Sequence, residues 1–124
     1  MEMKEGLHTI DKNGHYDLDI YREDIPKLSV IESIELTIGK WKLIRKYMEK
    51  TGDFAKRGTC VLCDLYPCHS CPIVVFTERD CLMTIHHYDT AVQESLWEET
   101  LNMVDEIIIQ LDEILAKASA KCNG

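Results

Sequence analysis

Five cysteines lie within the 22 positions from residue 60 to residue 81, close enough to hold one metal ion together. The segment reads C-x2-C-x4-C-x2-C-P, and a fifth cysteine follows further on; these residues are Cys60, Cys63, Cys68, Cys71 and Cys81. Two residues between cysteines let both thiolates face one ion across a tight turn, and a structural zinc needs four such ligands at about 2.3 Å. The spacing therefore predicts a zinc site built from four of the five, and it leaves open whether Cys71 or Cys81 is the fourth ligand.

An iron-sulfur cluster is the alternative occupant of these thiolates. The pair Cys71-Pro72 matches the Cys-Pro that ends the bacterial ferredoxin run, but that run is spaced C-x2-C-x2-C-x3-C-P, so the match is partial. Disulfides or ordinary core cysteines are less favoured, since clustered thiols in an intracellular chain point to metal or redox chemistry.

Catalytic motifs are missing around the cysteines. A thioredoxin-like pair needs a parallel βαβ pattern, which the sequence lacks. A zinc deaminase needs H-x-E upstream of P-C-x-x-C, and only the second half is present, at Pro67 to Cys71. A site whose ligands are all cysteines implies no open position for a substrate. We therefore find no catalytic constellation and favour a protein without enzymatic activity.

Other polar residues are weaker candidates for chemistry. His86 and His87 could approach a metal, although adjacent histidines entering a helix are more often exposed to solvent. Asp17 and Asp19 share one face of a predicted hairpin, where solvated edge carboxylates are expected. Cys122 lies near the C-terminus and is interpreted as an unliganded thiol.

Composition indicates a single intracellular domain. The chain has 124 residues, of which 45% are hydrophobic, and this length suits one core. No window approaches the 18 to 20 or so apolar residues of a membrane span, so we expect no membrane partner and a cytoplasmic location.

The net charge of -8 argues against general nucleic-acid binding, which depends on neutralising phosphates. The exception is the stretch 40–57, with a net charge of +5, whereas residues 89–124 carry -6. One interpretation places a basic helix against an acidic one. The alternative is a zinc-knuckle nucleic-acid binder, which would use these basic residues: Lys40, Lys42, Lys46, Lys56 and Arg57.

The elements that must position the cysteines begin with a β-hairpin at residues 7–21. Asn13-Gly14 favours a two-residue type I′ turn. That turn pairs Lys12 with His15, and counting outward sets Leu7 opposite Ile20 and Thr9 opposite Leu18.

Two long helices follow from apolar periodicity and end signals. The first spans about 29–50, with Ser29 and Glu32 as a capping box, Gly52 as C-cap and Gly39 as a weak point. The second spans about 90–118, starting at a capping box of Thr90 and Gln93, and its apolar residues recur every three or four positions. Its apolar stripe is wide enough for more than one contact, so it could also form a homodimer.

The predicted fold is therefore mainly α. An antiparallel helical hairpin of helices 29–50 and 90–118 is joined by a metal-binding cysteine loop at 58–84, and a small N-terminal β-hairpin completes a single domain of residues 1–124.

The order of these motifs resembles a group of small uncharacterised proteins from phage, archaeal-virus and prokaryotic genomes. Their pattern is a helix with Ser-Ile and Trp, then C-x2-C, C-x2-C-P and C-x2-T-P; the matching positions are Ser33, Ile34, Trp41, Cys60, Cys63, Cys68, Cys71, Pro72, Cys81 and Thr84. Two features depart from it, since Ile85 replaces the last proline and the gap between the cysteine pairs is short. The resemblance implies a metal-binding helical protein, with zinc as the metal and with no known activity. A virus- or phage-encoded member of this group would reside in the host cytoplasm.

These observations together favour a zinc-stabilised helical interaction protein that acts through a protein partner or itself. Zinc-knuckle nucleic-acid binding is the first alternative and iron-sulfur redox chemistry the second.

Overall fold

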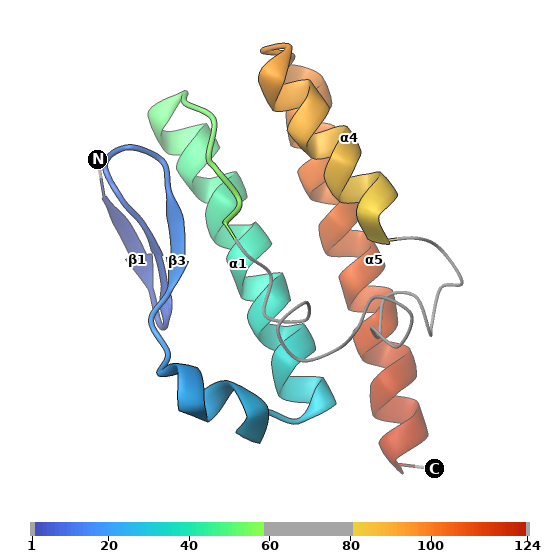
Figure 1. Cartoon of the computed structure of the whole chain (residues 1–124). Helices are drawn as coiled ribbons and strands as arrows, with labels where there is room; N and C mark the ends of the chain where they lie inside the picture. Colours follow the sequence, from blue (N-terminus) through green and yellow to red (C-terminus); the bar gives the residue numbers. More distant parts are fainter. Residues whose placement is uncertain (1, 59–80, 124) are drawn as a thin grey trace.

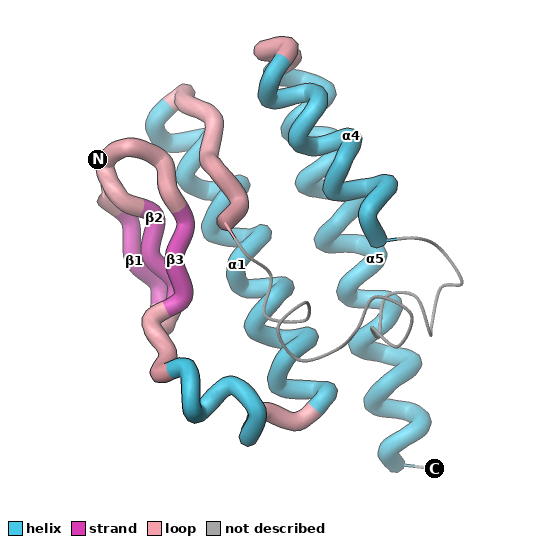
Figure 2. Tube along the Cα trace, viewed as in Figure 1, coloured by secondary structure: helices cyan, strands magenta, loops and turns pink. Residues whose placement is uncertain are grey.

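The computed structural model describes the backbone of residues 2–58 and 81–123, and the side chains of residues 2–58 and 87–120. Within these ranges the chain is mainly helical, as predicted, with a small antiparallel sheet at the N-terminal end (Figure 1). Three helices lie side by side, and the sheet packs on the first of them (Figure 2). The prediction of two helices was therefore wrong in number.

The sheet has three strands, one more than the predicted hairpin. Strands β1 (Met3–Glu5), β2 (His8–Ile10) and β3 (Tyr16–Leu18) pair antiparallel in that order. The predicted register was wrong by one residue, because Thr9 pairs with Asp17 and His8 with Leu18. A slip of one residue exchanges the faces of a strand, so the buried face carries His8, and Leu7 is exposed.

The turn between β2 and β3 explains the slip. Asp11 N–H donates to His15 C=O at 3.0 Å, and Gly14 N–H donates to Asp11 C=O at 3.0 Å. Gly14 has φ of 82°, while Asn13 keeps a negative φ, so the turn cannot be type I′. The result is a three-residue connection with glycine in the left-handed position, the second commonest kind of hairpin loop.

Helix α1 (Val30–Thr51) forms where the sequence predicts it, after a short 3₁₀ helix η1 (Arg22–Lys27). Ser29 Oγ accepts from Glu32 N–H, and the Glu32 carboxylate accepts from Ser29 N–H, each at 3.1 Å. Gly52 ends the helix in the left-handed conformation. The predicted apolar stripe is buried at Ile34, Ile38, Trp41, Ile44 and Met48. Both ends were predictable because the capping signals are local.

After α1 the chain returns along the sheet. Lys56 N–H donates to Gly14 C=O at 2.7 Å, and Tyr16 N–H donates to Lys56 C=O at 3.1 Å. Two glycines permit this approach: a Cβ on Gly14 would lie 3.0 Å from the Phe54 carbonyl oxygen, and one on Gly58 would lie 2.9 Å from that of Tyr16. Residues 54–58 therefore leave the sheet edge in a defined position.

The predicted helix 90–118 is two helices, α4 (Cys81–Gln93) and α5 (Trp97–Asn123). Ser95, at φ of 56°, ends α4 in a Schellman motif, in which Leu96 N–H donates to Ala91 C=O and Ser95 N–H to Val92 C=O. Thr90 thus lies inside α4 and caps nothing. Sequence reasoning missed the break because serine occupies the place that glycine usually takes.

The core lies between α1 and α5, with α4 covering a second side of α5. Val104, Ile107, Leu111 and Ile114 form the buried stripe of α5. Arg45 of α1 also donates from Nε to the Asp105 carboxylate of α5 at 3.1 Å. The basic helix does lie against an acidic one, and α5 contacts two helical partners within the chain.

Within residues 2–58 and 81–123, no helix combines the length and the apolar character that a membrane crossing requires.

Candidate metal centre

The predicted zinc ligands fall almost entirely beyond the described residues. Cys60, Cys63, Cys68 and Cys71 belong to residues 59–80, and Cys81 is the first residue of α4, where only the backbone is described. The ligand assignment therefore stays a prediction. The structure does describe the two flanks of this segment, and they contact each other.

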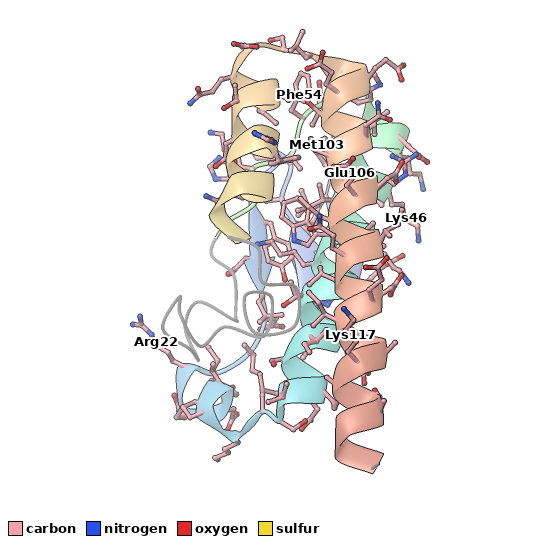
Figure 3. The ribbon with its side chains drawn as sticks, turned by 90° about the vertical axis from the view of Figure 1, so that its right-hand side faces the viewer. Arg22, Lys46, Phe54, Met103, Glu106 and Lys117 are labelled. Carbon is pink, nitrogen blue, oxygen red and sulfur yellow. The ribbon has the colours of Figure 1, made fainter. Side chains whose placement is uncertain are left out.

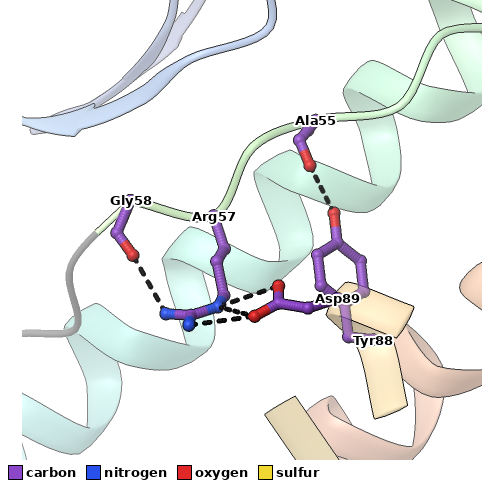
Figure 4. A network of polar contacts seen from close by, with 5 residues as sticks. All are labelled: Ala55, Arg57, Gly58, Tyr88 and Asp89. Carbon is purple, nitrogen blue, oxygen red and sulfur yellow. Dashed lines mark hydrogen bonds and ion pairs between the residues drawn. The ribbon is translucent and has the colours of Figure 1, made fainter. Parts of the chain in front are cut away.

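An ion pair joins the two flanks. Arg57 Nε donates to both carboxylate oxygens of Asp89, at 3.0 and 3.1 Å (Figure 4). The Nη2 atom of Arg57 lies 3.0 Å from Asp89 Oδ2. Arg57 also donates to Gly58 C=O at 3.2 Å, which orients the guanidinium. Arg57 lies just before residue 59, and Asp89 lies about two turns into α4, so the pair connects the start of the cysteine segment to the helix that follows it.

A second contact lies beside the first. The Tyr88 hydroxyl donates to Ala55 C=O at 2.6 Å (Figure 4). The Tyr88 ring also meets the Trp41 ring edge to face, with centroids 5.0 Å apart. Tyr88 is almost fully buried, and this burial raises the pKa of its hydroxyl, with the Asp89 carboxylate acting in the same direction. The hydroxyl stays protonated and keeps its hydrogen bond at neutral pH. We call these two contacts, Arg57–Asp89 and Tyr88–Ala55, the loop stem.

Sequence reasoning did not find the loop stem. Arg57 was assigned to the basic stretch, and Tyr88 and Asp89 received no role. The partners lie 32 and 33 positions apart in the chain, and no spacing rule connects residues at that separation.

The structure disperses the basic residues of the nucleic-acid alternative. Lys40 is 2% exposed, with its ammonium 5.1 Å from the Tyr16 ring centroid and 5.4 Å from that of Trp41. Lys46 pairs with Glu5 of β1, and Arg57 belongs to the loop stem. Lys42 and Lys56 are exposed. The alternative required all five charges on one exposed face, and Lys40 does not meet that requirement.

A buried polar cluster lies between the sheet and α1, where none was predicted. His8 Nδ1 and the Tyr16 hydroxyl share a hydrogen bond of 2.7 Å, and the two rings stack. The His8 ring fits against α1 because residue 39 is glycine; a Cβ there would lie 2.6 Å from His8 Nε2. Burial lowers the pKa of His8, Glu5 opposes this shift and Lys40 adds to it. Correct strand register would have placed His8 on the buried face.

The other polar residues that the sequence suggested for chemistry are exposed, or their side chains lie outside the described part of the chain. His87 is exposed on α4, and Asp17 and Asp19 are exposed on or beside β3. The side chains of His86 and Cys122 lie outside the described part of the chain. Among the side chains that the structure describes, no three His, Cys, Asp or Glu residues are close enough to hold a metal.

Comparison with protein families, with curated protein sequences and with solved structures found no match to this chain.

Proposed function

We propose that this chain is a zinc-stabilised helical interaction protein, in which four thiolates from Cys60, Cys63, Cys68, Cys71 and Cys81 hold one zinc ion. The zinc would act as a structural brace between α1 and α4, because an all-cysteine site has no open position for a substrate. A structural zinc of this kind contributes on the order of 10 kcal/mol to folding.

The loop stem is the observation that carries this proposal. The ligands are spread over 22 positions, and closing such a segment costs chain entropy. The stem holds the flanks together through a charge-assisted pair and a buried hydrogen bond, so part of that cost is met by the protein fold. Contacts that already join the two flanks lower the entropy cost that a bound ion would have to offset, and in this way they support the proposal.

Metal analysis of the purified chain tests the proposal, with about one zinc per chain expected. Cys71→Ser and Cys81→Ser separate the two candidates for the fourth position, and Cys122→Ser is the matched control, expected to keep its zinc. Unchanged zinc content in both of the first two variants would contradict the ligand assignment.

The iron-sulfur alternative predicts a different occupant of the same thiolates. Anaerobically purified protein would then be coloured and contain iron with inorganic sulfide. Colourless protein that contains zinc alone rules this alternative out.

Nucleic-acid binding is separated by its dependence on salt. Neutralising several phosphates makes affinity fall steeply as salt rises. The exposed positions Lys42, Lys46 and Lys56 would carry such binding. No binding to single-stranded or duplex probes at low salt would exclude it.

Sedimentation of the same sample tests the predicted homodimer through α5, whose apolar stripe already contacts α1 and α4.

A further inference from the structure

A groove runs between α4 and α5 on the surface of the helical pair. Its volume is about 310 Å³. His87 and Thr90 line it together with Ala91, Glu94, Leu96, Glu99, Asn102 and Met103. Figure 3 shows Met103 between the ribbons of α4 and α5. The groove exists because the Schellman motif turns the chain within three residues, which brings both helices together while small Ala91 leaves space between them.

The groove combines an apolar floor with acidic sides. Ala91 is buried, Met103 is half-buried, and Leu96 is 36% exposed. Glu94 and Glu99 stand exposed at the sides, and neither forms an ion pair with another residue in the described ranges. The site can therefore bury an apolar side chain while its carboxylates remain available to cations.

The charge around the groove is one-sided. Residues 81–116 contain eight Asp and Glu and no Lys or Arg. Two of these carboxylates, Asp89 and Asp105, are paired with arginines, and both arginines come from outside this stretch. The surface repels anionic partners, including nucleic acids and anionic membranes, and attracts cationic ones.

We propose that the α4–α5 groove binds a basic amphipathic helix of a partner protein. An apolar side chain of that helix would enter over Ala91 and Met103, while lysines or arginines one turn away would pair with Glu94 and Glu99. The volume is near the lower end of the roughly 300 to 1,000 Å³ typical of ligand pockets, which suits one or two anchoring side chains. This inference rests on the proposed role as an interaction protein and on none of the metal ligands.

A fluorescent peptide of about 15 leucine and lysine residues, long enough to form an amphipathic helix, is the probe. Fluorescence anisotropy should show binding that weakens as salt rises, and the same peptide with glutamate for lysine should not bind. Glu94→Gln with Glu99→Gln should lower affinity about fivefold. The control, Asp112→Asn with Glu113→Gln, removes the same charge from exposed positions of α5 outside the groove and should leave affinity unchanged.

A pair of variants at apolar residues tests whether the apolar lining of the groove contributes to binding. Leu96→Ser should weaken binding, whereas Ile109→Ser should not, although Ile109 is the more exposed of the two at 57%.

Circular dichroism and zinc content are measured for every variant, so that a failure of the zinc proposal is seen separately. Equal losses in the groove and control variants would overturn the inference, because binding would then be non-specific. Absence of binding at low salt would overturn it as well. So would self-association that depends on Glu94 and Glu99, because the occupant would then be a second copy.

Discussion

Gly39 lets the ring of His8 lie directly against the backbone of α1. In sequence terms this glycine is a defect, because glycine inside a helix costs about 1 kcal/mol relative to alanine. In the structure it is the place where the sheet and the helix approach each other, and the His8 ring is held there by its hydrogen bond to Tyr16. The residue thus exchanges helix propensity for packing of the sheet.

Gly39→Ala is therefore expected to destabilise the protein, by about 1 to 3 kcal/mol from overpacking. The gain in helix propensity is smaller than this cost. The double variant with His8→Ala should reverse the sign of the Gly39→Ala effect, since the ring that the Cβ meets has gone. Thermal or urea unfolding of the four proteins in this cycle measures the coupling. If Gly39→Ala has the same effect in both backgrounds, the contact has no energetic role.

His8 also makes the stability of the protein depend on pH. Its pKa is lowered below the ordinary value of 6.5, so between these two values the unfolded chain binds more protons than the folded one. The contribution of neutral His8 to the free energy of unfolding should be fully present above about pH 6.5. It should be lost as the pH falls through the pKa that His8 has in the folded protein. Urea unfolding between pH 7 and pH 5 measures this slope. The proposed zinc would also be lost in acid, as its thiolates become protonated, so the slope is compared between variants.

The slope should decrease in His8→Asn and stay unchanged in His15→Gln, which alters an exposed histidine of the same hairpin. Identical slopes in all three proteins would show that His8 does not titrate across this window.

Among the elements, the ends of α1 were predictable and the break between α4 and α5 was not. Ser29, Glu32 and Gly52 are local signals that act within one turn, so their effect can be read from the sequence. Asn13-Gly14 is compatible with both a two-residue and a three-residue turn, and the register of β2 and β3 depends on which of them forms. Packing of His8 and Tyr16 on α1 favours the three-residue turn. The loop stem depends on contacts across the fold, which no local pattern contains.

The break at residues 94–96 gives a sharp test of backbone conformation. Ser95 is the one non-glycine residue with positive φ within the described ranges, and a left-handed residue other than glycine costs about 1 kcal/mol. Ser95→Gly should therefore stabilise the protein by up to about 1 kcal/mol. The same substitution at Ser119, inside α5, should instead destabilise it by about 0.5 kcal/mol. Chemical denaturation of both variants checks the opposite signs; a loss of stability in Ser95→Gly would contradict the Schellman assignment.

For the whole molecule, the sheet with α1 forms one part and the α4–α5 pair forms the other. The core and the Arg45–Asp105 pair join them along α5, and the loop stem joins them at the flanks of the cysteine segment. The width of the α5 stripe, which suggested a homodimer, is accounted for by α1 and α4 together. Periodicity reports how much of a helix is apolar, and it does not identify the partner.

Breaking the loop stem should affect stability and metal binding together. Arg57 and Asp89 are each more than a third exposed, so Arg57→Ala should cost only about 0.5 to 1 kcal/mol. Zinc affinity, measured by competition with a chelator, should fall a few-fold, because the flanks are no longer held together. Asp24→Ala, which removes an exposed pair with Lys27 far along the chain, is the control and should leave zinc affinity unchanged. Equal zinc affinity in Arg57→Ala and the wild type would show that the stem and the metal site are independent.

The return of residues 54–58 to the sheet also bears on the order of events during synthesis. The backbone hydrogen bonds of Gly14 and Tyr16 with Lys56 close a unit whose members all precede Cys60, the first cysteine of the chain. Chains emerge from the ribosome with the N-terminal end first, so the sheet and α1 can meet before the cysteine segment has emerged in full. The cysteines then follow an N-terminal half that can already be formed, so the proposed zinc binding would be a late step that joins α4 and α5 to it.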